Sequence, residues 1–237
     1  MKLAIVIPTY NEAETIPSLI KELFEKIKQL VEKLDVLIID DSSPDGTADI
    51  VRELGGKYEK ITVIQRAKKM GLGAAYKEGF KHVLEKLDSE LIVQMDADHS
   101  HKPSEIPNML EKIKNFDFLI ASRHVEGSDV IGWGVGRKAT HSVAGVIARL
   151  CAKIDIKDST SGFRMFKKKT LEKSNFEDIR SDGFAFQIEV LHQLKKLGMK
   201  GLEVPTVFIN RMEGSSKMGT NEMMQFIIMC ISYIGRK

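Results

Sequence analysis

The chain has 237 residues, of which 43% are hydrophobic, and its formal net charge is +3. Its length fits one large domain or two small ones, and a charge so small and dispersed does not indicate a nucleic-acid-binding protein. The two cysteines, Cys151 and Cys230, offer neither a metal-binding spacing nor a disulfide framework, so we expect a reducing compartment. No stretch reaches the roughly 20 apolar residues of a membrane-spanning helix.

Short apolar runs alternate with segments of helical periodicity in the first half of the chain. We predict strands at 3–7, 35–39, 61–65, 90–95 and 117–122, and helices at 14–34, 47–55, 74–87 and from 103 onward. In the second half we predict a loop at 127–136, helices at 138–153 and 182–197, and a strand at 200–209. This alternation is typical of βαβ units and predicts an α/β fold with a mostly parallel central sheet flanked by helices.

Two carboxylates, Asp96 and Asp98, stand two residues apart where the fourth predicted strand ends. In extended backbone, residues i and i+2 project to the same side. Magnesium takes few protein ligands and keeps places for phosphate oxygens, so the pair could hold an ion that neutralises a leaving diphosphate. His99, Ser100 and His101 follow and offer a further ligand or an outer partner. The alternative is a solvated acidic turn.

A second acidic cluster, Asp40, Asp41 and Asp45, follows the second predicted strand. Ligands of open α/β sheets bind at the carboxyl ends of the strands, where a carboxylate can accept from a ribose hydroxyl or a base nitrogen. Residues 43–47 (SPDGT) predict an Asx-turn and a helix cap, which explains Asp45 as part of a turn. The adjacent acids Asp40 and Asp41 stay unexplained by that interpretation.

Two further segments could approach a ligand. Residues 8–12 (PTYNE) end the first strand, where Tyr10 could stack on a base and Glu12 could accept a hydrogen bond; the alternative is a turn capped by Asn11. Gly71 and Gly73 open a helix without bulky side chains, which permits either ligand approach or close packing. The second half adds cations suited to phosphate, each of which could also be a solvated surface residue: Arg123, Arg137, Arg164, Arg211 and Lys217.

Together these motifs resemble family 2 glycosyltransferases of the GT-A fold, which is Rossmann-like, and within that family the dolichol-phosphate mannose synthases. The segments that carry the resemblance cover nearly the whole chain: IPTYNE (7–12), DDSSPDGT (40–47), GLGAAYKEGF (71–80), MDADHSHKP (95–103), SR (122–123), STSGFR (159–164), FQIE (186–189) and EVPTVF with R..GSSK (203–217). The resemblance implies a catalytic domain over residues 1–219, with a half that binds the nucleotide-sugar (1–123) and a half that binds the acceptor (124–219).

The resemblance also implies roles for individual residues. The donor nucleotide-sugar would be held by Pro8, Tyr10, Glu12, Asp40, Asp41, Asp96, Ala97 and Asp98. Mg²⁺ or Mn²⁺ would be bound by Asp96, Asp98 and Ser100. Phosphate groups of the acceptor or donor would contact Arg123, Arg137, Ser142, Arg211 and Lys217. Of all these, the expected catalytic residues are Asp96, Asp98, Arg123, Arg211 and Lys217.

The implied reaction is a metal-dependent, inverting transfer of mannose from GDP-mannose to dolichyl or polyprenyl phosphate. A phosphate monoester has a second pKa of about 6, so the acceptor is already anionic and catalysis rests on positioning and charge stabilisation. One rival is a transferase of the same fold that uses UDP-glucose or a soluble saccharide acceptor, with Asp182 or Glu189 as catalytic base. Another is a non-catalytic nucleotide-binding module that regulates a membrane complex.

Residues 220–237 predict a C-terminal helix that is apolar around most of its circumference, with no charge between Glu222 and Arg236. It could dock into the protein or a second subunit, or lie in the membrane interface. With the resemblance, the latter predicts a cytoplasmic protein attached peripherally to the cytoplasmic face of the membrane. Its partners there would be the membrane surface itself or a membrane protein.

Overall fold

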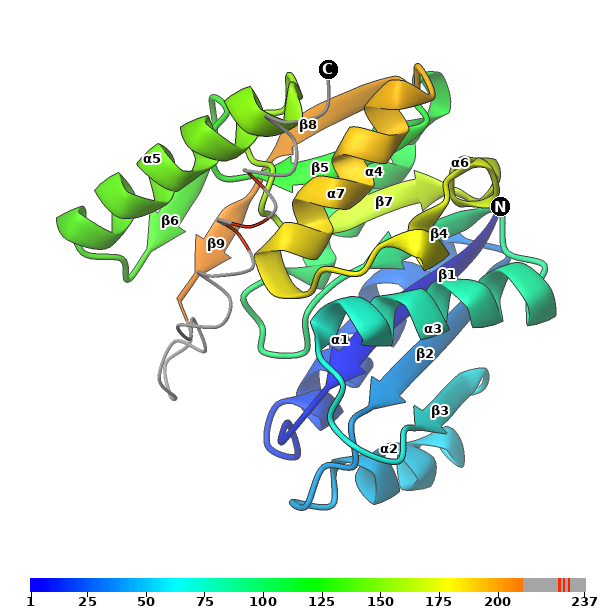
Figure 1. Ribbon diagram of the computed structural model, residues 1–237. Helices are drawn as coiled ribbons and strands as arrows, with labels where there is room; N and C mark the ends of the chain where they lie inside the picture. The colour runs from blue at the N-terminus through cyan, green and yellow to red at the C-terminus, as the bar shows by residue number, and fades with distance from the viewer. Residues whose placement is uncertain (211–225, 227, 229, 231–237) are drawn as a thin grey trace.

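The computed structural model describes residues 1–210, 226, 228 and 230, except for the side chains of 135, 137–139 and 141 (Figure 1). The elements of the first half are β1 (Lys2–Thr9), α1 (Ile16–Ile27), β2 (Lys33–Asp40), α2 (Thr47–Gly55), β3 (Ile61–Gln65), α3 (Leu72–Lys86), β4 (Leu91–Gln94), α4 (Ile106–Lys112) and β5 (Phe118–Ser122). The second half contributes β6 (Asp129–Ile131), α5 (Val135–Ala152), β7 (Arg164–Lys167), α6 (Lys168–Lys173), α7 (Gly183–Lys196), β8 (Gly201–Pro205) and β9 (Val207–Ile209). Short 3₁₀ helices cover Lys28–Leu30, Pro103–Glu105, Ile113–Asn115 and Phe176–Asp178.

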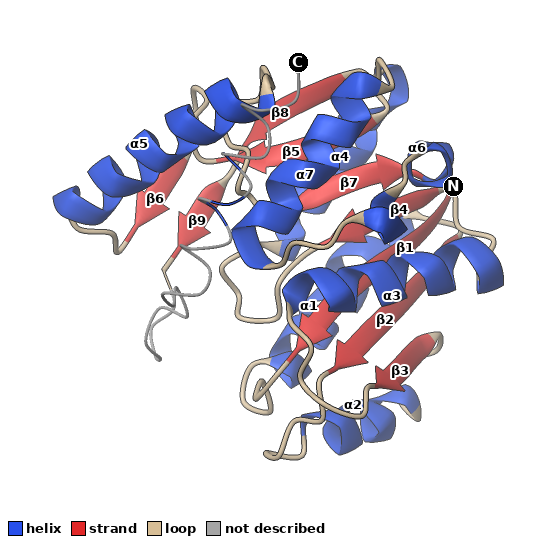
Figure 2. Ribbon diagram, in the orientation of Figure 1, coloured by secondary structure: helices blue, strands red, loops and turns tan. Residues whose placement is uncertain are grey.

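Within the described residues, a seven-stranded sheet runs in the order β3-β2-β1-β4-β7-β5-β8. Its strand pairs are parallel except those of β7, which is antiparallel to both β4 and β5. Helices cover both faces, as Figure 2 shows. Because both faces of β1, β2 and β4 are buried, these strands are almost continuously apolar, and the mostly parallel α/β prediction is confirmed.

The side chains of β1 alternate between two hydrophobic clusters. Leu3, Ile5 and Ile7 pack with residues of α1 and α4 on one face. Ala4 and Val6 pack with residues of α3 and α7 on the other. This alternation follows from the two-residue period of a strand, and it fixes which helices lie beside the carboxyl end of the sheet.

Several elements differ from the sequence prediction. The helix predicted for 14–34 ends at Ile27, and β2 begins at Lys33, because Val31 and Leu34 reach the same core as α1 from extended backbone. The strand predicted for 200–209 is interrupted at Thr206: β8 pairs with β5, whereas β9 pairs with β6, which lies in the predicted loop 127–136. The unpredicted strand β7 has the sequence RMFK, whose two apolar residues are too few to give a strand signal.

The predicted C-terminal helix lies largely outside the described residues. Of it, Phe226, Ile228 and Cys230 are helical; Phe226 and Cys230 pack on the cluster that contains α7, while Ile228 is exposed. Within the part of the chain that the structure describes, we find no helix both long and apolar enough to cross a membrane.

Candidate active site

The carboxyl ends of β1, β2 and β4 meet the start of α3 around a pocket of about 320 Å³. The residues that line it are Pro8, Thr9, Tyr10, Glu12, Asp41, Lys69, Gly71, Leu72, Ala75, Asp96, Ala97 and Asp182. The structure thus brings together six of the residues expected to hold a donor, although they come from segments up to 89 positions apart (Pro8 and Ala97). Four lining residues are acidic and one is basic, so a diphosphate in this pocket would need a cation beside it.

One end of the pocket carries an aromatic ring and a fixed carboxylate. Lys69 Nζ lies 3.9 Å from the centroid of the Tyr10 ring. Asp41 accepts from Arg66 Nε in a buried ion pair and from the main-chain N–H of Met70 at 3.4 Å. Arg66 also donates to the Gly71 carbonyl at 3.0 Å, so it links β3 to the loop before α3. Sequence reasoning missed Arg66 and Lys69, whose only signal is their place between β3 and Gly71.

Asp40 and Asp45 shape the loop beneath this end of the pocket. Asp40 is fully buried and accepts from the hydroxyls of Thr9 and Ser43, at 2.9 and 2.5 Å. A direct contact between Asp40 and a nucleotide therefore stays a prediction. Asp45 accepts from the main-chain N–H and the hydroxyl of Thr47, at 3.1 and 2.6 Å, as expected of an Asx-turn.

Asp96 is held from two directions. Its main-chain N–H donates to His101 Nδ1 at 3.0 Å, and the His101 ring stacks on Phe163 with centroids 5.1 Å apart. The hydroxyl of Tyr76 donates to Asp96 Oδ1 at 3.1 Å. Burial, and then the neighbouring charge of Asp96, raise the pKa of Tyr76 well above its ordinary value, so the hydroxyl stays a donor. Sequence reasoning gave Tyr76 no role, although a tyrosine on an apolar helix face signals a buried hydroxyl in need of a partner.

Asp98 is bound to the turn that follows it. Its Oδ1 accepts from the main-chain N–H and the hydroxyl of Ser100, at 3.1 and 2.6 Å. The buried Ser100 hydroxyl is thus engaged with Asp98, and its role as a metal ligand stays a prediction. Among the described residues, no group of three His, Cys, Asp or Glu side chains is placed to hold a metal ion. The donor set fits Mg²⁺ or Mn²⁺ all the same, because both accept a pair of carboxylates completed by phosphate and water.

Asp182 reaches the pocket from the loop before α7. Its Oδ1 accepts from the main-chain N–H of Gly73 at 2.5 Å, at the first turn of α3. A Cβ on Gly71, whose φ is +94°, would lie 1.7 Å from Asp182 Oδ2. Close packing on a carboxylate therefore requires a glycine at position 71, and because Gly71 also lines the pocket, ligand approach to it stays a prediction.

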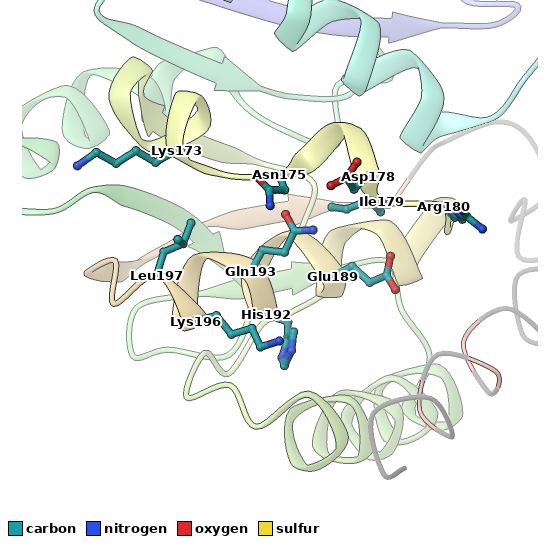
Figure 3. Close-up of a pocket in the computed structure, with 10 residues that line it drawn as sticks. All are labelled: Lys173, Asn175, Asp178, Ile179, Arg180, Glu189, His192, Gln193, Lys196 and Leu197. Atoms are coloured by element: carbon teal, nitrogen blue, oxygen red, sulfur yellow. The ribbon is translucent and has the colours of Figure 1, made fainter. Parts of the chain in front are cut away.

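Glu189, the other candidate base of the rival transferase, lies elsewhere. It accepts from the Ser181 hydroxyl at 2.7 Å. It lines a separate pocket of about 630 Å³. Figure 3 shows it on α7, with His192 and Arg180 also lining that pocket. Only Asp182 of these two carboxylates thus lines the pocket that contains Asp96.

Arg123 directly follows β5 and forms a buried ion pair. Its Nε and Nη2 donate to the two oxygens of Asp158, both at 2.7 Å, and Nη2 also donates to Thr160 at 3.0 Å. Trp133 and Phe208 lie 5.6 and 5.3 Å from the guanidinium. Burial alone would raise the pKa of Asp158, but the charge and hydrogen bonds of Arg123 outweigh it and hold that pKa well below its usual range. A phosphate contact of Arg123 stays a prediction.

Of the other cationic side chains expected near phosphate, one is buried and the rest are not described by the structure. Arg164 is fully buried and donates to the carbonyls of Ser159, Ser161 and Gln187, at 2.9, 2.8 and 2.9 Å, so it braces a loop instead of facing a phosphate. Burial lowers its pKa to about 9. Arg137 and the exposed Ser142 lie on the first two turns of α5, and the Arg137 side chain is not described. Arg211 and Lys217 lie outside the described residues.

Comparison with known proteins decides the family. The sequence profile of glycosyl transferase family 2 matches residues 4–174, which is more than half of the chain. The chain belongs to this family. It is 35% identical over 218 residues to an undecaprenyl-phosphate mannosyltransferase of Micrococcus luteus, covering 92% of this chain and 88% of that protein. It is 36% identical over 220 residues to a polyprenol monophosphomannose synthase of Mycolicibacterium smegmatis, covering 92% and 81%.

Solved structures of other sugar transferases share the fold of this chain. A glucosyl-3-phosphoglycerate synthase of Mycobacterium tuberculosis, in complex with Mn²⁺, UDP and phosphoglyceric acid, aligns with a TM-score of 0.71 at 18% identity, over 99% of this chain and 78% of that one. A mannosyltransferase of Pyrobaculum calidifontis, in complex with GDP-Man and Mn²⁺, aligns with a TM-score of 0.63 at 16% identity, over 99% and 64%. At these identities the likeness establishes the GT-A arrangement of this family 2 chain and nothing finer.

Proposed function

We propose that this chain transfers mannose from GDP-mannose to dolichyl or another polyprenyl phosphate. The observation that carries the proposal is the acidic pocket at the carboxyl ends of the strands, which Asp96 lines together with Tyr10, Asp41 and Glu12. The curated relatives at 35% and 36% identity, which are named for undecaprenyl-phosphate and polyprenol mannosyl transfer, support the choice of sugar and acceptor. The mannosyltransferase solved with GDP-Man supports the guanine nucleotide.

A divalent cation completes the proposed site. Asp96 and Asp98 would hold Mg²⁺ or Mn²⁺, the ions present in solved complexes of the same fold. When bound, such an ion supplies charge neutralisation for the departing diphosphate. The protein's own part is to keep the two carboxylates in place, through Tyr76, His101 and the Ser100 turn, and to present a ring and an acceptor group to the nucleotide.

The proposed transfer needs no catalytic base. An oxygen of the acceptor phosphate forms a bond to the anomeric carbon while the bond from that carbon to the diphosphate breaks, so the nucleoside diphosphate leaves and the configuration inverts. The monoester is already anionic near neutral pH, because its second pKa is about 6. Arg123, Arg137, Ser142, Arg211 and Lys217 are the proposed contacts for the acceptor phosphate, and Tyr10 and Asp41 would align the donor.

The donor and acceptor assignment can be tested with one panel. The full chain is assayed with GDP-mannose, GDP-glucose, UDP-glucose and UDP-galactose, each with a polyprenyl phosphate or with 3-phosphoglycerate, in Mn²⁺ or in excess EDTA. We expect lipid-extractable product with GDP-mannose and polyprenyl phosphate, and none in EDTA. Product only on the soluble acceptor would overturn the proposal in favour of the rival transferase, and binding of nucleotide without any transfer would favour the regulatory module.

The outer face of α5 supports peripheral attachment to the membrane. Val143, Val146, Ile147 and Leu150, at the i, i+3, i+4, i+7 spacing of one helix face, are exposed, and Leu150 is 73% exposed. Helix α5 contains no acidic residue, and the hollow beside Val146 and Leu150 is lined by three basic residues and one acidic residue: Arg149, Lys153, Lys195 and Asp155. An exposed apolar stripe with basic neighbours fits an anionic lipid surface, and Figure 1 shows α5 at the periphery of the molecule, away from α1 to α3.

Vesicle sedimentation tests this attachment. We expect the wild type to sediment with vesicles of anionic phospholipid and Leu150→Asp to lose most of that binding. Leu30→Asp is the matched control, because Leu30 is also exposed, at 50%, but lies in the 3₁₀ helix after α1 and not on α5. Equal binding by all three would overturn the role of α5, and binding of none would leave a membrane-protein partner as the route to the membrane.

A further inference from the structure

Tyr76 lies inside the protein, on the face of α3 turned to the sheet. Its side chain is fully buried, and its ring stacks with those of Phe80 and Phe186, at centroid distances of 5.8 and 6.3 Å. A tyrosine buried among aromatic rings needs a partner for its hydroxyl. That partner is Asp96 Oδ1, at 3.1 Å, at the carboxyl end of β4.

The position of the Tyr76 hydroxyl is set by how closely α3 packs on the sheet. A Cβ on Gly79, one turn along the helix, would lie 2.4 Å from Val6 and 3.3 Å from Ile39. Helix α3 therefore rests directly on β1 and β2, and it has no room to move toward them. A group carried by this helix is a rigid reference point for a neighbouring side chain.

Among the residues that the structure describes, the Asp96 carboxylate has few other contacts to fix it. Its side chain is 33% exposed and opens onto the pocket. His101 fixes the Asp96 backbone through the N–H at 3.0 Å, but the nearest nitrogen of His101 to the carboxylate is 3.9 Å away. The hydrogen bond from Tyr76 is thus the contact that can set the rotation of the carboxylate about χ2.

We propose that Tyr76 is a positioning residue, whose hydroxyl holds the Asp96 carboxylate in the orientation that receives the divalent cation. The inference rests on the proposed metal-dependent transfer, since it assigns Asp96 to the metal. Hydrogen-bond partners behind a metal ligand raise affinity because the ligand is already oriented when the ion arrives, and losing one costs about 10- to 100-fold in affinity. Tyr76 touches neither the ion nor the sugar in this scheme and acts through Asp96.

The experiment measures Mn²⁺ binding directly. Mn²⁺ is titrated calorimetrically into the full chain saturated with GDP, for the wild type and for Tyr76→Phe, which removes one oxygen and keeps the ring. We expect the Kd for Mn²⁺ to rise at least about tenfold in Tyr76→Phe. GDP binding in EDTA is expected to be unchanged, because the nucleotide contacts do not involve Tyr76.

Two control variants separate positioning from packing. Phe80→Leu disturbs the same aromatic cluster without touching the hydroxyl, so it is expected to lower the Tm and leave the Kd for Mn²⁺ unchanged. Tyr58→Phe removes a tyrosine hydroxyl from the opposite face of the sheet, where Tyr58 stacks on Phe24, and is expected to change neither Kd nor turnover.

The outcomes distinguish this inference from the proposed function. If the wild type binds Mn²⁺ but Tyr76→Phe binds it equally tightly, the positioning role is wrong and the metal-dependent transfer stands. If Phe80→Leu weakens Mn²⁺ binding as much as Tyr76→Phe does, the effect comes from packing, and the positioning role is again wrong. If the wild type itself does not bind Mn²⁺ with GDP, the metal-dependent function fails, and the inference fails with it.

Discussion

The amino ends of the strands form one side of the main sheet, called here the amino edge, and their carboxyl ends form the carboxyl edge. Both edges carry ion pairs, but in different surroundings. At the amino edge, Lys2 and Lys33 contact Asp88 at 3.0 and 2.6 Å, and the three side chains are 28–56% exposed. At the carboxyl edge, Arg123 and Asp158 contact each other at 2.7 Å with side chains 7% and 0% exposed. Solvent screens the first set, whereas the second loses its hydration and depends on both partners. The edge that buries its charges is also the edge that holds the pocket.

The largest expected difference between the two edges appears when one carboxylate is removed from each. Asp96→Ala is expected to lower kcat/KM by on the order of a thousandfold or more, since a metal contributes several kcal/mol of charge stabilisation in the transition state. Asp88→Ala is expected to leave kcat/KM unchanged. The measurement is the initial rate of lipid-linked product formation, with circular dichroism to confirm that both variants fold. Wild-type turnover by Asp96→Ala would refute the role of the acidic pair.

The second test concerns stability. Asp158→Asn leaves Arg123 buried beside a neutral partner, so the free energy of unfolding is expected to fall by about 3–5 kcal/mol. The matching change at the amino edge, Asp88→Asn, is expected to shift the urea midpoint little, because its partners stay solvated. Both values come from urea unfolding followed by tryptophan fluorescence, which reports on Trp133 beside Arg123. Equal losses in the two variants would show that burial does not separate the edges.

The smallest expected effect is the pH dependence of the buried pair. The pKa of Asp158 is lowered in the folded protein, whereas an unfolded aspartate titrates at about 3.9. The pair's stabilisation is therefore fully present above about pH 4–5 and is lost as pH falls through the folded pKa. We expect the wild-type urea midpoint to decrease on acidification below that range, and the decrease to be shallower in Asp158→Asn. Parallel pH profiles would contradict the assignment.

Several features of the site could be predicted from local sequence. The segments 3–7 and 36–39 are apolar throughout, and this pattern alone predicts strands covered on both faces of a sheet. Acids that follow such strands must gather at one edge, so the sequence predicts that Asp41 and Asp96 lie together, as they do in the pocket. The Asx-turn at Asp45 was likewise local, since its donors lie two residues away.

The partners of these residues were decided by the tertiary structure alone. Tyr76 and Asp96 are 20 positions apart, Arg123 and Asp158 are 35, and Gly73 and Asp182 are 109. No periodicity connects such positions, because each contact depends on how a helix or an antiparallel strand packs against the sheet. For the same reason the sequence left Asp182 and Glu189 equivalent, and only the packing of α7 on α3 places Asp182 in the pocket and Glu189 outside it.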